Sequence, residues 1–235
     1  MKELYKQATF RRKFVNHDLQ IHSWESLESY FVFLSNKNIS SKQELIEWLE
    51  LRSELDSVIE EEMAWRYINM NCDTTNAEYA ELFQKFVADI DPEIQKFSNV
   101  LDKKLLSSQF FSDLGSEYFI PLRAISKRES LFCEKNIPII SELQQQEQEY
   151  GVINSKMTVV IDSKELTLQQ ASVKLKSTDR NLREQVFTLI SNRRLLDETS
   201  LHDLLSSLII KRNEIALNAG FDNYADFKFQ DLGRF

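Results

Sequence analysis

Glycine and proline are scarce in this sequence of 235 residues, which contains four glycines and three prolines. Average usage is about 7% and 5%, so the residues that separate the strands of strand-rich folds are nearly missing. The glycines lie too far apart for a Gly-rich phosphate loop; they are Gly115, Gly151, Gly220 and Gly233. The sequence therefore favours long helices and excludes nucleotide binding through such a loop.

Cysteines and long apolar runs are also few. The two cysteines, Cys72 and Cys133, could form at most one disulfide, which is few for a secreted protein that is stabilised by disulfides. The longest apolar run, Tyr30–Leu34, has five residues, whereas a transmembrane helix needs about 20. The basic residues near the N-terminus are not followed by the apolar segment of a secretory signal. These features predict a cytoplasmic protein without a membrane partner.

Basic residues are outnumbered, because 29 Lys and Arg stand against 37 Asp and Glu, for a formal net charge of −8. Nucleic acids need clustered Lys and Arg, so we do not expect them as partners. The charge is uneven: residues 41–62 carry eight acids and two bases, and residues 173–194 carry six bases and two acids. These segments face either each other or water, and solvated helix faces are the favoured interpretation.

Apolar residues recur at helical spacing along most of the chain. The pattern predicts helices over 24–34, 41–67, 76–90, 92–105, 139–150, 167–176, from 179 onward, and 200–219. Pairs that form capping boxes mark several helix starts; they are Ser41 with Glu44, Thr75 with Glu78, and Thr167 with Gln170. Asp179 is expected to cap the helix that follows it, and Gly220 to end the last long helix in a left-handed conformation.

One strand pair interrupts the helices. The β-branched run 157–161 and the segment 165–167 flank a polar turn, which predicts a hairpin. The expected fold class is therefore mainly α: a multi-helix bundle with long antiparallel helices and one small β-hairpin near 157–167.

Histidines are too few and too scattered for a metal site. No pair among His17, His22 and His202 has the spacing of a helical His-Glu-x-x-His. His17 and His22 are five residues apart, which places them about 140° apart on a helix and on opposite faces of a strand. We therefore expect surface or turn histidines and no metal ligands in this chain.

Other residue types do not indicate catalysis either. Cys72 precedes Asp73, which would raise the thiol pKa, and Cys133 lies in an apolar setting, so both are interpreted as packing residues. Neighbours within Glu60–Glu62 point about 100° apart on a helix and form a solvated face. The sequence predicts no catalytic, cofactor-binding or metal-binding residue.

Aromatic residues are interpreted structurally as well. Trp24, Trp48 and Trp65 fall within helical patterns and are expected in the core or at its boundary. Residues Thr9–Phe14 form a basic and aromatic arm that could bind an anionic partner. The overall negative charge favours the other interpretation, in which the arm is a strap that packs on an acidic helix.

A series of short phrases occurs in order between about residue 70 and residue 235. They are Asp73-Thr74; Leu131-Phe132 with Asn136-Ile137-Pro138; Met157-Thr158-Val159 leading to Thr167-Leu168-Gln169; Asp179-Arg180 with Arg183-Glu184; Arg212 to Ala216; Gly220 to Phe227; and Gly233-Arg234-Phe235. Together they resemble the N-terminal half of the oligoendopeptidase F family, zinc metallopeptidases related to thimet oligopeptidase.

The resemblance implies a helical lobe that forms one wall of a deep channel for short peptides. It divides the chain into an N-terminal helical region (1–110), an N-terminal module with the hairpin (111–184), and the start of the catalytic-domain helices (185–235). The family's zinc motif lies downstream of the matched segment. We therefore expect the N-terminal, non-catalytic portion of a cytoplasmic zinc metalloendopeptidase, inactive alone, whose partners are short peptides and a missing C-terminal catalytic half.

The alternative is a stand-alone helical protein-interaction module without enzymatic activity. A coding sequence that continues past Phe235 into a His-Glu-x-x-His would support the peptidase, and a natural stop there would support the module. A short helix near 224–229 is expected to leave an apolar patch uncovered, which predicts a homodimer or aggregation.

Overall fold

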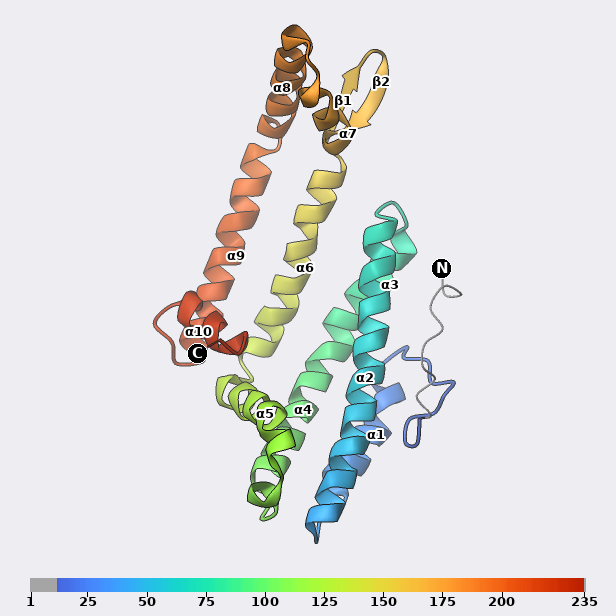
Figure 1. The fold of residues 1–235 in the computed structure, drawn as a ribbon, viewed down its shortest axis with the longest axis vertical. Helices are drawn as coiled ribbons and strands as arrows, with labels where there is room; N and C mark the ends of the chain where they lie inside the picture. Colours follow the sequence, from blue (N-terminus) through green and yellow to red (C-terminus); the bar gives the residue numbers. More distant parts are fainter. Residues whose placement is uncertain (1–11, 235) are drawn as a thin grey trace. The chain divides into compact units, whose positions relative to one another are not determined.

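The computed structural model describes residues 12–234 and is mainly helical, with one two-stranded hairpin (Figure 1). This confirms the predicted fold class. The chain divides into two compact units. Unit 1 comprises residues 1–134 and 229–235, and unit 2 comprises residues 135–228. The division into three parts at 110/111 and 184/185 stays a prediction.

Unit 1 is built from helices that follow the predicted periodicity. The longest, α2, has 31 residues, in agreement with the prediction of a helix of unusual length. Ser41 caps it by accepting a hydrogen bond from the Glu44 amide, while the Glu44 carboxylate accepts from Ser40. The elements are α1 (Glu25–Asn36), α2 (Lys42–Cys72), α3 (Ala77–Lys85), a π-helix (Phe86–Ile90), α4 (Asp91–Leu106), two 3₁₀ turns (Phe111–Asp113 and Ser116–Tyr118) and α5 (Phe119–Leu131).

The core of unit 1 lies where α1, α2 and α4 meet. Trp48 is fully buried, and its indole N–H donates to the Leu34 carbonyl at 2.9 Å, so the ring is packed and its polar atom is satisfied. Trp24 stacks on Phe97 with a centroid distance of 4.8 Å. Trp65 is half-buried. All three tryptophans thus occupy the core or its boundary, as predicted.

The segment from α3 to α4 corrects one predicted cap. Asn76, rather than Thr75, caps α3, because its side-chain oxygen accepts from the amides of Glu78 and Tyr79. The predicted break before Pro92 is a π-helix that joins α3 directly to α4. Pro92 lies in the first turn of α4, where its missing N–H costs no helical hydrogen bond.

Unit 2 contains a pair of long helices and a hairpin. Helices α6 and α9 run antiparallel side by side (Figure 1). Hydrogen bonds between residues 136 and 215, 142 and 211, and 146 and 207 fix their register. The elements are α6 (Asn136–Ser155), β1 (Thr158–Ile161), β2 (Lys164–Thr167), α7 (Leu168–Val173), a 3₁₀ turn (Lys174–Lys176), α8 (Arg180–Leu195), α9 (Glu198–Asn218) and α10 (Tyr224–Asp231), the last of which continues into unit 1.

The hairpin forms without a glycine in its turn. Asp162 and Ser163 adopt φ values of 53° and 62°, the left-handed conformation that a two-residue turn of type I′ needs at both positions. The inward residues Val159 and Ile161 pack with Val186 of α8 in a small separate core. The predicted capping box of Thr167 with Gln170 and the Asp179 cap are both present.

Candidate functional site

A group of four charged side chains in unit 1 centres on a buried pair, Arg52 and Asp102. We call Arg52, Asp56, Asp102 and Arg128 the Asp102 cluster; they come from α2, α4 and α5. Asp102 is 1% exposed and accepts hydrogen bonds from Arg52 Nη2 and from Arg128 Nε and Nη2, the last two at 2.8 and 3.0 Å. Arg52 is 3% exposed and lies with its guanidinium 5.7 Å from the Trp48 ring centroid.

The electrostatics of the Asp102 cluster are those of a structural ion network. Hydrogen bonding to Asp102 raises the pKa of Arg128. Burial desolvates Asp56 and raises the pKa of its carboxyl, while Arg52, with its Nε 3.6 Å from Asp56 Oδ2, opposes that rise. Both carboxylate oxygens of Asp102 are engaged by arginines that stay protonated. The cluster therefore ties three helices together.

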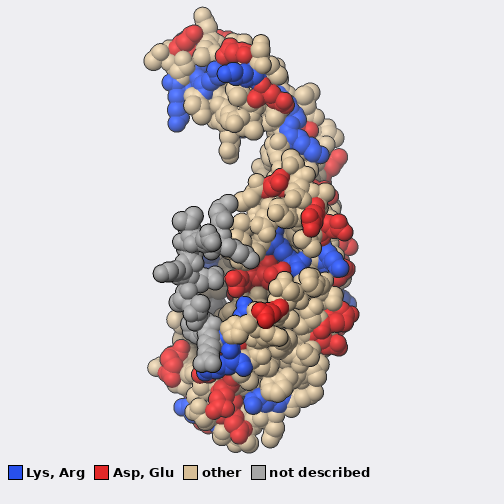
Figure 2. Space-filling model, turned by 90° about the vertical axis from the view of Figure 1, so that its right-hand side faces the viewer, with Lys and Arg blue, Asp and Glu red and all other residues tan. Residues whose placement is uncertain are grey.

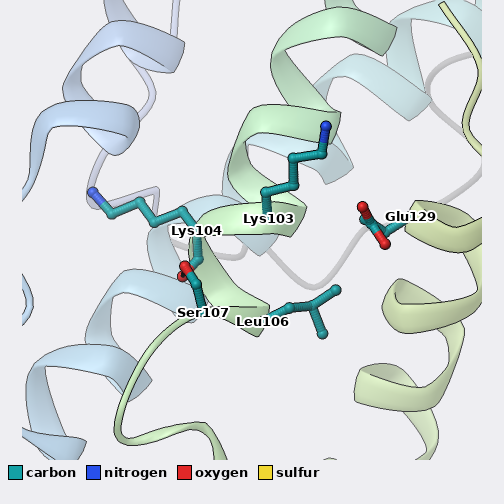
Figure 3. Close-up of a pocket in the computed structure, with 5 residues that line it drawn as sticks. All are labelled: Lys103, Lys104, Leu106, Ser107 and Glu129. Atoms are coloured by element: carbon teal, nitrogen blue, oxygen red, sulfur yellow. Dashed lines mark hydrogen bonds between the residues drawn. The ribbon is translucent and has the colours of Figure 1, made fainter.

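A shallow pocket of about 460 Å³ lies between α4 and α5, and Figure 3 shows its lining. Lys103, Lys104, Leu106, Ser107 and Glu129 line it. The Lys104 ammonium points toward α1 and donates to the carbonyls of Leu34, Ser35 and Lys37 at 3.0, 2.7 and 2.6 Å. Burial lowers the Lys104 pKa, but these three contacts make the ammonium a cap for the end of α1 rather than a nucleophile.

The three histidines are not brought together. His17 and His22 are exposed near the start of the described chain, and His202 is exposed on α9. Among residues 12–234, no three His, Cys, Asp or Glu side chains are grouped so that they could hold a metal ion. The residues that the structure describes thus do not fit a zinc site, and no catalytic step can be derived through one.

The cysteines are both free thiols. Cys133 is half-buried, but Cys72 is exposed at the last position of α2, so the prediction that it is a packing residue is wrong. The apolar periodicity of α2 ends before Cys72. Of the predicted solvated face, Glu60 and Glu61 are exposed, and Glu62 pairs with Arg66 one turn later.

The predicted N-terminal strap is present where the chain is described. One carboxylate, that of Glu54 on α2, accepts hydrogen bonds from the backbone amides of Lys13, Phe14 and Val15 at 2.8 to 3.0 Å. Desolvation opposes ionisation of Glu54, but the three amides together lower its pKa. Residues 9–11 of the predicted arm lie outside the described residues. Figure 2 shows acidic and basic side chains intermixed on the drawn face of unit 1.

In unit 2, the phrases singled out in the sequence hold α6, α9 and α10 together. Asn136 is 3% exposed, and its Nδ2 donates to the Ile215 carbonyl. Gly220 has a φ of 83°, and the Phe221 amide donates to the Ala216 carbonyl, which confirms the predicted helix end. Asn223 caps α10 by accepting from the Asp226 amide.

Arg212 of α9 pairs with a partly exposed acid. Its Nη2 lies 2.8 Å from Glu147 of α6, whose side chain is 46% exposed. The guanidinium also lies 5.9 Å from the Tyr224 ring centroid. Charge pairing and an aromatic contact thus link α9 to α6 and α10.

Comparison with known protein families bears on unit 1. Residues 14–123 match the family model of the peptidase M3 N-terminal domain. This segment is therefore similar to peptidase M3 N-terminal domains. The matched segment runs from the strap into the first turns of α5 and contains Arg52 and Asp102. A comparison with curated proteins gave no match.

Solved structures share the fold over nearly the whole chain. PZ peptidase A with an inhibitor aligns at a TM-score of 0.84 and 20% identity, covering 97% of this chain and 40% of that one. A protein from Bacillus anthracis strain Ames described as an oligoendopeptidase F aligns at 0.85 and 18% identity, covering 97% and 41%. Another protein so described aligns at 0.84 and 19%, covering 96% and 39%. The chain therefore spans about two fifths of the length of these structures and shares their fold.

Proposed function

We propose that this chain supplies the N-terminal, non-catalytic region of a zinc metalloendopeptidase of the oligoendopeptidase F type. In that enzyme it would form one wall of the channel that short peptides enter. The observation that carries the proposal is the agreement of fold over 96–97% of the chain with structures described as such peptidases. The match of residues 14–123 to the peptidase M3 N-terminal domain supports it independently, because it rests on sequence.

The proposal assigns different tasks to different parts of the polypeptide. The residues described here would build and stiffen a wall through the Asp102 cluster in unit 1 and the antiparallel pair α6 and α9 in unit 2. Zinc, on which the M3 family depends, would be held by residues outside those described, since the described ones do not fit such a site. Peptide cleavage therefore requires a partner, which we propose to be the family's catalytic half.

The proposed location is the cytoplasm. Cys72 is an exposed free thiol, which a reducing compartment preserves. In the part of the chain that the structure describes, no helix has both the length and the apolar character needed to cross a membrane.

The test compares two proteins. One is the 235-residue chain, and the other is the product of its coding sequence read through any codons that follow Phe235. We expect the extended protein to bind zinc stoichiometrically and to cleave a quenched-fluorescent peptide, and the 235-residue chain to do neither. Chelator-sensitive cleavage by the 235-residue chain at enzyme-like rates would overturn the proposal. A stop codon directly after Phe235 would instead favour a helical interaction module, for which the exposed apolar residues of α9 are the supporting observation.

A further inference from the structure

One side of α9 carries large aliphatic side chains in the open. Leu205, Ile209, Ile210 and Leu217 are 52%, 47%, 66% and 64% exposed. We call these four residues the α9 outer face. They belong to one helix of unit 2, and single exposed leucines are common on protein surfaces, but four along one side of a 21-residue helix form a patch.

The position of α6 shows which side of α9 is left open. Leu204, Leu208 and Ile215 are buried, and the polar contacts to α6 come from the same side: Ser207 to Gln146, Lys211 to Glu142 and Arg212 to Glu147. At about 100° per residue, Ile209, Ile210 and Leu217 point away from this contact surface, and Leu205 lies at its edge, about 20° from Arg212. Figure 1 shows α6 and α9 side by side within the unit.

The open side of α9 carries fewer charges than the water-facing side of an ordinary surface helix, which usually carries most of them. Lys211 and Arg212 form ion pairs with α6 on the packed side. Between Leu205 and Leu217, the polar residues that share the side of the α9 outer face are Ser206 and Asn213, and the exposed Glu214 lies at its edge. An exposed apolar side of this kind is typical of a surface that another protein segment covers.

We propose that the α9 outer face is the docking surface for the polypeptide that continues beyond this region in the proposed peptidase. This inference rests on the proposed function and adds to it the residues that receive the partner. The solved structures that share the fold are about two and a half times as long as the aligned part, since the alignment covers 39–41% of them. In the proposed peptidase, the same polypeptide would supply an occupant in cis, at high effective concentration.

Thiol labelling measures whether the face is covered. Ile209→Cys, and separately Leu217→Cys, are made both in the 235-residue chain and in the protein extended through its own coding sequence. The rate of maleimide labelling at each cysteine is measured by peptide mass mapping. The labelling rate of the unfolded protein gives the maximum. Native Cys72, exposed at the end of α2, serves as the internal reference. We expect at least about tenfold slower labelling at 209 and 217 in the extended protein than in the 235-residue chain, as for a residue protected by a folded interface.

The other outcomes contradict either the docking inference or the proposed function. Equal labelling rates in the two proteins would overturn it, and so would a coding sequence that stops directly after Phe235. Protection that rises with the concentration of the 235-residue chain, together with a doubled mass in light scattering, would assign the face to a second copy. If the extended protein cleaves peptide while position 209 labels freely, the docking inference fails and the proposed function stands. If position 209 is protected but zinc and cleavage are missing, the proposed function fails alone.

Discussion

The side-chain amide of Asn136, at the start of α6, donates to the main-chain carbonyl of Ile215, near the end of α9, at 2.9 Å. The Asn136 oxygen accepts from Asn218 at the same distance, and the residue is 3% exposed. One buried side chain thus fixes where two long antiparallel helices meet.

Replacing Asn136 is expected to destabilise unit 2. Asn136→Ala removes the donor to Ile215 and leaves buried polar groups without a partner, which costs about 1–3 kcal/mol. Urea unfolding followed by far-UV circular dichroism measures the change. The matched control is Asn154→Ala, because Asn154 is half-buried and donates to a main-chain carbonyl of the same helix through an exposed hydrogen bond. Equal effects of the two substitutions would contradict the assigned role of Asn136.

The unfolding of unit 1 can be followed separately from that of unit 2, because Trp24, Trp48 and Trp65 all lie in unit 1. Asp102→Ala removes the buried partner of Arg52, leaves it only the more distant Asp56, and is expected to cost about 3–5 kcal/mol. Tryptophan fluorescence in urea reports the loss. Asp89→Ala, at an exposed position of the same continuous helical segment, should change stability by less than about 0.5 kcal/mol. If the two variants unfold at the same urea concentration, the Asp102 cluster does not stabilise unit 1.

The free energy of unfolding of unit 1 should depend on pH through Asp91. Burial raises the pKa of this carboxyl above its ordinary value of 3.8, against the opposing hydrogen bond from Gln95. A raised carboxyl pKa means that its contribution to stability is fully present below 3.8 and is lost as the pH rises through the folded-state pKa. The stability of Asp91→Asn relative to the parent chain should therefore be most favourable near neutral pH and fall as the pH is lowered. A difference independent of pH would contradict this.

Glu54 is expected to hold the strap. Glu54→Ala removes the acceptor for the amides of Lys13, Phe14 and Val15, so trypsin should cut after Lys13 faster than in the parent chain. Glu50→Ala is the control, because Glu50 reaches only the exposed Lys13 ammonium, at 3.7 Å. Cleavage rates that rise equally in both variants would show that charge alone holds the strap.

Two glycines of unit 2 should respond to alanine with opposite signs. Gly220 has a positive φ, so Gly220→Ala should cost about 1 kcal/mol through backbone strain, although nothing lies within 4 Å of the added Cβ. Gly151 lies inside α6 with equally open surroundings, so Gly151→Ala should stabilise the unit by about 0.5–1 kcal/mol. Circular dichroism melts of both variants measure the pair. A stabilising Gly220→Ala would show that the helix does not end as described.

Local patterns predicted most of the secondary structure. Helix periodicity, the Asp179 cap and the Gly220 helix end depend on residues a few positions apart, so they can be read along the chain. The cap of α3 is Asn76 rather than the predicted Thr75. The prediction was wrong by one position, because both residue types favour the N-cap. The type I′ turn at Asp162 and Ser163 was harder to predict, because it lacks the usual glycine.

The tertiary contacts could not be predicted in the same way. Asp102 meets Arg52 across 50 positions of sequence, and no local rule pairs them. A signal did exist: Arg52 falls four residues after Trp48 and three before Leu55, on the buried stripe of α2, where an arginine requires a partner. The open side of α9 could not be predicted either, because no local pattern shows that α6 covers only one side of this helix.

The most direct test of the account asks whether this chain touches the substrate. A short peptide that carries a photo-crosslinker is bound to the extended, zinc-loaded protein and irradiated, and the labelled residues are mapped by mass spectrometry. If residues 12–234 form one wall of the peptide channel, labels will appear both within them and in the zinc-binding part. Labels confined to the zinc-binding part, in a protein that cleaves the same peptide, would contradict the account.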